Sequence, residues 1–415
     1  MITGKKHLKC GLLGKKLSHS FSPKIHGELA DYSYSLIELS EDEVGRFLKG
    51  GNFDALNVTI PYKKTVMPYL DEISDKARRI GAVNTITKTK SGTLRGDNTD
   101  YYGFWHTVET SGIAIKNQKV LILGTGGASL TAKTVCEDMG AEEITFVSRS
   151  GETNYENVYE KCADTEVIIN CTPVGMYPKN GISPIVLEKF KNCKGVIDMI
   201  YNPAKTELLI SAEKLRIKCV NGLTMLVAQA KKACELFLDQ KISDDEIGKI
   251  TDLIAHQMQN IILVGMPGCG KTTVGQLLSE LTGRKVVDTD FMITEKHGRT
   301  PAEIIKTDGE EAFRIIESEA VSEAGKMSGV IIATGGGAVT KDINKNPLCQ
   351  NGKIIFINRS LKALDIFDRP LSKNLEALYE KRLPLYRKFC DFEVSNDSSP
   401  KLCAQTILER FKNVK

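Results

Sequence analysis

The segment GMPGCGKTT at residues 265–273 constrains the fold more than any other short stretch of this 415-residue chain. It matches Gly-x-x-x-x-Gly-Lys-Thr in full, follows the apolar run at 261–264 and precedes the helix-like VGQLLSEL. A glycine-rich turn between a strand and a helix directs backbone N–H groups and the positive end of the helix dipole toward a phosphate. The segment therefore predicts a P-loop, in which Lys271 reaches the terminal phosphates and Thr272 holds Mg²⁺.

Apolar runs bounded by turns alternate with helical patterns along almost the whole chain. The strand-like runs are ALNVTI (55–60), VLILG (120–124), EITFVS (143–148), EVIINC (166–171), KGVIDMI (194–200), IILVG (261–265), VIIATGGG (330–337) and KIIFI (353–357). This alternation is typical of α/β proteins with mostly parallel sheets. At roughly 100–200 residues per domain, the length predicts two or three domains. A capping-box pattern at 243–246 predicts a helix through IGKITDLIAHQM that joins the two halves.

Charge and composition exclude several classes of protein. The net charge of +4 comes from 56 basic and 52 acidic residues spread over both halves, so no basic face for nucleic acid or a membrane stands out. No apolar stretch approaches the roughly 18 residues of a membrane span, and no apolar segment of a signal peptide follows MITGKKHLKC. The eleven cysteines never form C-x-x-C, which favours reduced thiols. We expect a soluble, cytoplasmic protein with small anionic ligands.

A second glycine turn, GTGGAS at 124–129, follows VLIL and opens another helical pattern. It departs from G-x-G-x-x-G because Ser129 replaces the third glycine. The next strand-like run ends in Ser148, Arg149 and Ser150, where an NAD enzyme usually has an acidic residue for the ribose 2′-hydroxyl. An arginine flanked by hydroxyls suits a 2′-phosphate, so we expect a Rossmann-like domain that binds NADP.

Further motifs accompany the P-loop in order across residues 260–415. They are DTD (288–290), GEEAFRIIE (309–317), TGGG (334–337), DRPL (368–371) and RLPLY (382–386). This ordered set resembles shikimate kinase, a P-loop kinase with a parallel sheet. No guanine-binding N-K-x-D motif is present, since NKNP at 344–347 lacks the aspartate; this disfavours a GTPase.

The resemblance to shikimate kinase assigns roles in this half. Guanidinium groups bind carboxylates bidentately, and the resemblance gives this task to Arg314 and Arg382 for a polyhydroxy carboxylate substrate. It makes Asp290 the group that orients the attacking hydroxyl. It also implies a backbone contact from Gly336, Mg²⁺ binding by Thr272 and Asp288, and catalytic roles for Lys271 and Arg369. The ATP-binding residues that it implies are Gly268, Cys269, Gly270, Lys271, Thr272, Thr273 and Arg369. Glu317, three residues after Arg314, lies on the same helical face, and we expect it to hold the Arg314 guanidinium in place.

Seven segments around the second glycine turn resemble shikimate dehydrogenase over residues 8 to about 256. They are 18–23, 57–63, 81–85, 96–100, 170–176, 198–203 and 222–229. A lysine near a carboxylate can donate a proton to a ketone oxygen as hydride reaches the carbon, so Lys63 and Asp100 are the candidate catalytic pair. We assign His26 no acid/base role, because packing on the following helix is expected.

The resemblance to shikimate dehydrogenase implies two sets of binding residues. Substrate binding falls to Ser18, Ser20, Thr59, Lys63, Asn84, Asp100, Tyr201 and Gln229. NADP binding falls to Asp75, Gly124, Gly126, Gly127, Ala128, Ser129, Ser148, Arg149, Ser150, Met199 and Gly222. We expect a substrate-binding lobe at 1–103 completed by helices of 222–257, an NADP domain at 104–221 and a kinase domain at 258–415.

Together the resemblances imply a bifunctional enzyme. NADPH would reduce 3-dehydroshikimate to shikimate, and ATP with Mg²⁺ would phosphorylate the 3-hydroxyl of shikimate. Two alternatives stay open. In the first, one half has only a regulatory or binding role. The kinase half is the more doubtful of the two, because the chain between KIIFI and Arg369 is short. In the second, the dehydrogenase half acts on quinate with NAD. We expect small-molecule substrates, no nucleic acid or membrane partner, and a monomer or homodimer.

Overall fold

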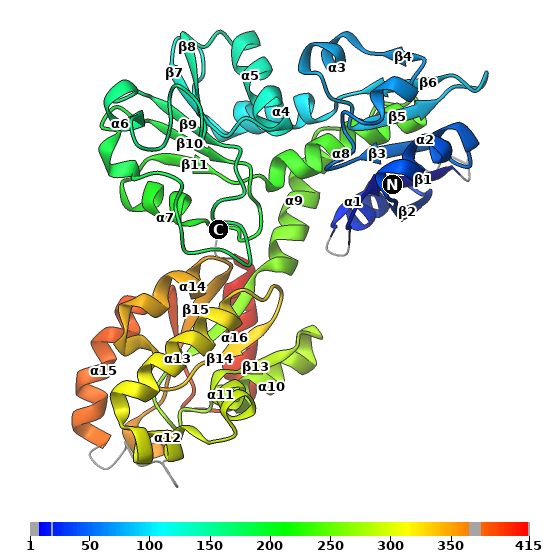
Figure 1. The fold of residues 1–415 in the computed structure, drawn as a ribbon. Coiled ribbons are helices and arrows are strands. Elements are labelled where there is room, and N and C mark those ends of the chain that lie inside the picture. Colours follow the sequence, from blue (N-terminus) through cyan, green and yellow to red (C-terminus); the bar gives the residue numbers. More distant parts are fainter. Residues whose placement is uncertain (1–7, 18–19, 365–374, 414–415) are drawn as a thin grey trace. The chain divides into compact units, whose positions relative to one another are not determined.

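The computed structural model describes residues 8–17, 20–364 and 375–413 (Figure 1). The chain divides into two compact units. Unit 1 comprises Met1–Gly175, Ile182–Tyr201 and Ser211–Leu253; unit 2 comprises Met176–Gly181, Asn202–Ile210 and Ile254–Lys415. Each unit has hydrophobic core clusters of its own.

The first sheet of unit 1 is mixed and contains six strands among the described residues, in the order β2-β1-β3-β5-β6-β4. The strands are β1 (Lys9–Gly14), β2 (Ser33–Glu38), β3 (Ala55–Val58), β4 (Glu72–Ile73), β5 (Thr85–Lys88) and β6 (Leu94–Asp97). β5 runs antiparallel to β3 and β6, whereas β1, β2 and β3 are parallel. The antiparallel pairing brings Asn84 to the end of β3, where its carbonyl oxygen accepts a 2.7 Å hydrogen bond from Val58 N.

The second sheet of unit 1 is entirely parallel over its described residues. Its five strands follow the order β11-β10-β9-β7-β8. They are β7 (Lys119–Leu123), β8 (Glu143–Val147), β9 (Val167–Asn170), β10 (Gly195–Asp198) and β11 (Lys218–Val220). β8 and β9 lie on opposite sides of β7, so the strand order reverses at β7. The GTGGAS turn directly follows β7. Ligands of open parallel sheets bind outside the carboxyl ends of the strands where the strand order reverses.

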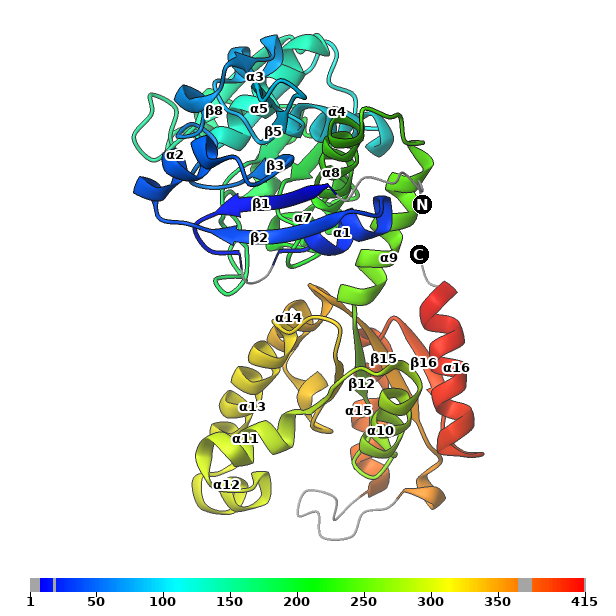
Figure 2. The same cartoon turned by 90° about the vertical axis from the view of Figure 1, so that its right-hand side faces the viewer.

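Helices cover the two sheets of unit 1. They are α1 (Ser22–Leu29), α2 (Glu41–Gly50), α3 (Asp75–Ile80), α4 (Asp100–Ser111), α5 (Gly127–Asp138), α6 (Val158–Lys161), α7 (Glu207–Lys214), α8 (Leu223–Leu238) and α9 (Asp245–Met258), of which α7 and α9 cross into unit 2. α8 packs against α4 and α1 (Figures 1 and 2). The helix predicted through IGKITDLIAHQM is present as α9, but the predicted capping box is not formed. Because α9 begins at Asp245, the Ser243 hydroxyl accepts a hydrogen bond from Asp245 N, and Glu246 binds Lys249 instead.

The sheet of unit 2 is parallel and has the order β13-β14-β12-β15-β16 within the described residues. The strands are β12 (Asn260–Val264), β13 (Val286–Asp288), β14 (Ile331–Ala333), β15 (Gly352–Asn358) and β16 (Phe392–Ser395). β12 lies in the centre with all its residues buried, which explains its uninterrupted apolar run. The P-loop follows this central strand, and the segments after β13, β14 and β15 reach the same edge of the sheet.

Helices flank the sheet of unit 2 on both faces. They are α10 (Lys271–Thr282), α11 (Thr289–His297), α12 (Pro301–Asp308), α13 (Glu310–Gly325), α14 (Lys345–Cys349), α15 (Leu375–Phe389) and α16 (Pro400–Asn413). Figure 2 shows α10 and α16 side by side on one face, with α13 and α14 on the other. The eight predicted apolar runs all contain a strand, and the predicted α/β class with parallel sheets is confirmed. Among the described helices, none is long and apolar enough to cross a membrane.

His26 on α1 packs as a neutral ring in unit 1. Its ring stacks on Tyr34 with centroids 4.1 Å apart, and its Nδ1 lies 2.6 Å from the Tyr32 hydroxyl. Burial lowers the pKa of His26 to about 3, and its Nε2 has no hydrogen-bond partner among the described residues. Because burying a cation is costly and no described carboxylate forms an ion pair with His26, the folded state disfavours the charged ring. The packing role expected for His26 is confirmed.

Replacing His26 with Phe should make unit 1 less sensitive to acid. A folded-state pKa near 3, below the ordinary value, contributes stability above pH 6.5 that is lost as the pH falls toward 3. Between pH 7 and pH 5 the wild type should lose about 2 kcal/mol of unfolding free energy from this group, and His26→Phe should not. Urea unfolding followed by the fluorescence of Trp105, the single tryptophan, reports on unit 1. His297→Phe, in unit 2, should leave that pH dependence unchanged; an equal acid sensitivity of His26→Phe and wild type would contradict the assignment.

Candidate active sites

Unit 1 contains a cavity of about 630 Å³ lined by residues of its first sheet, of segments that follow strands of its second sheet, and of α8. Most residues predicted for the dehydrogenase substrate line it. The predicted residues found there are Ser20, Thr59, Lys63, Asn84, Asp100, Ala128, Met199, Tyr201, Gly222 and Gln229. Ser18 lies outside the described residues. Segments from 20 to 229 in the sequence therefore meet in one cavity.

The Lys63 ammonium and the Asp100 carboxylate form an ion pair in this cavity, with Nζ 2.6 Å from Oδ2. Lys63 lies in the turn after β3, and Asp100 is the first residue of α4. A carboxylate in the first turn of a helix interacts favourably with the helix dipole. Both side chains are largely but not fully buried, at 26% and 14% exposed, so each can still reach a ligand.

Hydrogen bonds hold the polar walls of the cavity in place. Asn84 Oδ1 accepts a 2.7 Å hydrogen bond from Thr99 N, directly before Asp100. Asn57 Nδ2 donates to Thr85 Oγ1 at 3.4 Å, and Asn57 Oδ1 accepts a 2.7 Å hydrogen bond from the Tyr34 hydroxyl. Asn57 was not predicted as a site residue, because a buried asparagine at a strand end usually serves only the backbone. Burial raises the pKa of Tyr201, so its phenol stays protonated and can donate.

The glycine turn after β7 leaves backbone accessible to a ligand. Gly124 has φ +101°, which favours glycine, and an added Cβ would lie 3.1 Å from Thr172. Added Cβ atoms at Gly126 and Gly127 would meet no atom within 4 Å, so open space borders the start of α5. The Ser129 side chain, predicted to face the cofactor, is buried instead, and its hydroxyl donates to the Gly126 carbonyl at 2.6 Å. Ser129 thus closes the turn.

The remaining predicted cofactor residues lie in different surroundings. Ser148, Arg149 and Ser150 follow β8, the strand beside β7, and Arg149 is exposed with no hydrogen-bond or ion-pair partner among the described residues. Asp75 is exposed in the first turn of α3 and does not line the cavity. Gly222 is restricted by space, because an added Cβ would lie 2.1 Å from the Met199 carbonyl oxygen.

Unit 2 contains a cavity of about 510 Å³ around the P-loop. Its lining residues are Gly268, Gly270, Lys271, Thr272, Thr273, Asp288, Asp290, Thr334, Gly336 and Arg359. Gly268 and Gly270 have φ +79° and +96°, values that favour glycine. Cys269 lies between them, fully buried, with its carbonyl held by Asn396 Nδ2 at 2.8 Å. Arg369 lies outside the described residues.

Lys271 is held inside the P-loop by backbone carbonyls. Its Nζ donates to Gly265 O at 2.9 Å and to Met266 O at 3.0 Å. Next to it, the Thr272 hydroxyl lies 3.2 Å from Asp288 Oδ2. A hydroxyl and a carboxylate beside a phosphate cradle fit Mg²⁺, which takes few protein oxygens and completes its shell with water and phosphate.

The residues predicted to bind the kinase substrate converge at the glycine turn at 335–337. An added Cβ at Gly335 would lie 2.6 Å from Glu317 Oε1 and 2.8 Å from Asp290 Oδ1. At Gly337 an added Cβ would lie 2.0 Å from Arg314 Nη1. The predicted contact between Arg314 and Glu317 is present, with Nη1 2.7 Å from Oε2, and both side chains are buried. The pair is therefore part of the protein interior and not a solvated surface pair.

Arg382 reaches the same glycine turn from α15. Its Nη1 donates to the Gly336 carbonyl at 3.2 Å, and the Tyr386 hydroxyl donates to the same oxygen at 2.5 Å. Burial raises the pKa of Tyr386, which keeps the phenol a donor. The Gly336 carbonyl thus orients Arg382.

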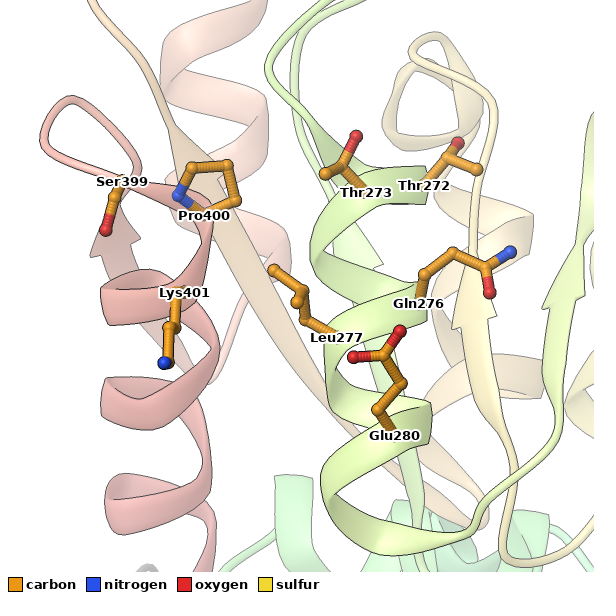
Figure 3. Close-up of a pocket in the computed structure, with 8 residues that line it drawn as sticks. All are labelled: Thr272, Thr273, Gln276, Leu277, Glu280, Ser399, Pro400 and Lys401. Atoms are coloured by element: carbon orange, nitrogen blue, oxygen red, sulfur yellow. The ribbon is translucent and has the colours of Figure 1, made fainter.

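A third cavity, of about 540 Å³, continues from the P-loop between α10 and the start of α16 (Figure 3). It shares Thr272 and Thr273 with the P-loop cavity. Its other lining residues are Gln276, Leu277, Glu280, Ser399, Pro400 and Lys401. The stretch 395–400 contains no basic residue, and Lys401 directly follows it.

Family models of two enzyme domains match this chain. The model described as shikimate dehydrogenase substrate binding domain matches residues 12–86. The model described as shikimate kinase matches residues 267–412.

Curated relatives match the amino-terminal part. The shikimate dehydrogenase (NADP(+)) of Clostridium beijerinckii is 39% identical over 257 residues, which cover 56% of this chain and 94% of the relative. The enzyme of the same name from Methanosphaera stadtmanae is 34% identical over 278 residues, which cover 60% of this chain and 97% of the relative.

Solved structures match the same part. A chorismate mutase/shikimate 5-dehydrogenase fusion protein from Clostridium acetobutylicum is 37% identical with a TM-score of 0.57, and covers 59% of this chain and 96% of its own. A shikimate 5-dehydrogenase from Thermus thermophilus, in complex with NADP(H) and shikimate, is 28% identical with a TM-score of 0.54, and covers 59% and 98%.

Adding a methyl group at position 337 should destabilise unit 2 through Arg314. The backbone at Gly337, with φ −100° and ψ −4°, suits alanine, so the obstacle is the Arg314 guanidinium. Gly337→Ala should lower the unfolding free energy by about 1–3 kcal/mol, and this cost should largely vanish in an Arg314→Ala background. Calorimetry of the full chain measures both, with Trp105 fluorescence identifying the transition of unit 1.

Gly275→Ala on α10 is the matched control. Its added Cβ meets no atom closer than 3.6 Å, so stability should be unchanged or slightly higher. If the Gly337→Ala cost persisted after Arg314 was truncated, the packing described here would be wrong.

Proposed function

The chain belongs to the shikimate dehydrogenase family and carries a shikimate kinase domain, and on this premise we propose that it catalyses two consecutive reactions. The first is NADPH-dependent reduction of 3-dehydroshikimate to shikimate. The second is ATP-dependent phosphorylation of the shikimate 3-hydroxyl. The observation that carries the proposal is that each unit has its own set of converging polar groups: the Lys63–Asp100 pair in unit 1, and the P-loop cavity, which Lys271 and Asp290 both line, in unit 2.

In unit 1, we assign the proton transfer to Lys63. Its ammonium would donate a hydrogen bond and then a proton to the ketone oxygen, while the Asp100 carboxylate, 2.6 Å away, holds the ammonium and accepts from a neighbouring substrate hydroxyl. Ser20, Thr59, Asn84, Tyr201 and Gln229 line the same cavity and would bind the carboxylate and remaining hydroxyls. Bound NADPH supplies the hydride.

The NADP site is assigned to the carboxyl edge of the second sheet. The open backbone of Gly126 and Gly127 at the start of α5 suits a pyrophosphate. The unpaired guanidinium of Arg149, at the end of the neighbouring strand, suits the 2′-phosphate. Met199 and Gly222 would contact the nicotinamide side, since both line the substrate cavity.

In unit 2, we assign acceptor binding to the groups around the glycine turn. Arg314 and Arg382 would bind the shikimate carboxylate, and the buried Glu317 keeps Arg314 oriented. Asp290 would accept the hydrogen bond of the attacking 3-hydroxyl. Lys271 and the P-loop amides would bind the phosphates, with Thr272 and Asp288 holding Mg²⁺, which neutralises phosphate charge.

The adenosine end of ATP is assigned to the cavity in Figure 3. This cavity continues from Thr272 and Thr273, so a nucleotide with its phosphates in the P-loop can reach it. Leu277 and Pro400 offer apolar surface for the base. We take the domains as 1–103 with 222–257 for the substrate lobe, 104–221 for NADP and 258–415 for the kinase.

Separate substitutions should abolish the two activities one at a time. Lys63→Ala should reduce dehydrogenase kcat at least a hundredfold and leave the kinase unchanged, because it removes the proton donor. Lys271→Ala should do the reverse, because it removes a phosphate ligand. Both activities are measured on the full chain in separate assays: NADPH oxidation with dehydroshikimate reads the dehydrogenase, and phosphorylated product from added shikimate and ATP reads the kinase. An intact chain that phosphorylates no shikimate would leave the kinase half only a binding role.

Arg149 should set the preference for NADPH over NADH. Arg149→Ala should lower kcat/KM for NADPH about tenfold or more and change that for NADH little, since only NADPH has the 2′-phosphate. Arg216→Ala, an arginine before β11, serves as the control and should change neither value. Equal use of both cofactors by the wild type would contradict this role of Arg149. Together with a preference for quinate, it would favour the alternative in which the dehydrogenase half acts on quinate with NAD.

A further inference from the structure

Arg359 directly follows β15, at the edge of the sheet where β12 leads into the P-loop. β12 and β15 are paired with Val264 opposite Phe356, so Arg359 lies beside the start of the loop. Its Nη1 is 3.5 Å from the Gly268 carbonyl oxygen, and the side chain lines the 510 Å³ cavity together with Lys271. No motif in the sequence assigned this arginine a role.

The Arg359 guanidinium has few partners in the part of the chain that the structure describes. Its Nε is buried and has no hydrogen-bond acceptor there. The hydrogen bond to Gly268 is long, and no described carboxylate forms an ion pair with Arg359. Asp397 is near enough for Arg359 to contribute to its lowered pKa, but this carboxylate accepts its main hydrogen bonds from Ser360 N and Ser395 Oγ. A partly buried guanidinium with unused donors is costly unless a ligand supplies acceptors.

The cavity in front of Arg359 is lined by the P-loop, whose sequence motif is typical of phosphate binding. Lys271 is the other cation among its described lining residues, and its Nζ lies against two backbone carbonyls. Phosphate oxygens would satisfy the Nε and Nη donors of a guanidinium in a bidentate arrangement, which a lysine cannot provide.

We propose that Arg359 binds the polyphosphate chain of the nucleotide, an inference that rests on the proposed kinase function. Arg359 is thereby a nucleotide-binding residue beside Lys271, at the end of the strand next to the P-loop strand. The competing explanation is mechanical: through Gly268, Arg359 would merely support the loop. The two roles of Arg359 predict different effects. If Arg359 only supports the loop, it stabilises the protein in the absence of nucleotide; if it binds phosphate, it does not.

The test uses the full chain with Arg359→Gln, Arg359→Lys and the control Arg387→Gln, which removes an exposed arginine that pairs with Glu393. Titration calorimetry measures Kd for ATP and for ADP with Mg²⁺, kinetics give KM for shikimate, and thermal unfolding is recorded without nucleotide. Arg359→Gln should weaken ATP binding at least tenfold, leave the KM for shikimate and the unfolding temperature unchanged, and retain dehydrogenase activity. Arg359→Lys should show a smaller loss of ATP affinity, because one ammonium replaces the planar fork. Arg387→Gln should behave as wild type.

Unchanged ATP affinity in Arg359→Gln would overturn the inference. If Arg359→Gln also unfolds at lower temperature, Arg359→Lys decides: weaker ATP binding at unchanged unfolding temperature supports the phosphate role, and any other pattern assigns Arg359 to loop support. The proposed function fails separately. A wild type that binds no ATP would overturn both, whereas a wild type that phosphorylates shikimate and an Arg359→Gln variant of equal affinity would overturn only the role of Arg359.

Discussion

Both candidate nucleotide sites depend on one geometric constraint, the meeting of strand carboxyl ends at one edge of a parallel sheet. In unit 1 the glycine turn follows β7, where the strand order reverses. In unit 2 the P-loop follows the central strand β12; Thr334 and Arg359 follow its neighbours β14 and β15, and Asp288 ends β13, the strand beyond β14. Residues far apart in the sequence become neighbours because parallel strands deliver them to the same place.

These sites also require side chains to approach the backbone closely, and glycine makes this possible. At positions 335 and 337 a Cβ would collide with the side chains of Glu317 and Arg314, so the absence of a side chain is what lets two charged groups lie under the backbone. At Gly222 the obstacle is the Met199 carbonyl. The two turns differ in what they offer. The turn at 124–129 offers backbone, which suits the cofactor pyrophosphate proposed there, while 265–273 adds Lys271 and Thr272, which suit the phosphate transfer that we propose.

Local patterns predicted much of this protein. The eight apolar runs became strands, both glycine turns lie between strand and helix, and the connecting helix is present as α9. These features depend on a few neighbouring residues, so a single sequence reveals them. The pairing of Arg314 with Glu317 was also readable, because residues three apart on a helix share a face.

Other features depended on what packs against what. The sequence by itself determined which residues can bind phosphate, transfer a proton or hold a carboxylate, because that chemistry belongs to the side chains. Only the tertiary structure decided that Ser129 turns inward to Gly126, that Asn57 is held by Tyr34 in the cavity of unit 1, and that Arg359 borders the P-loop. These contacts depend on strand order and burial. They involve packing between segments that no local sequence pattern connects.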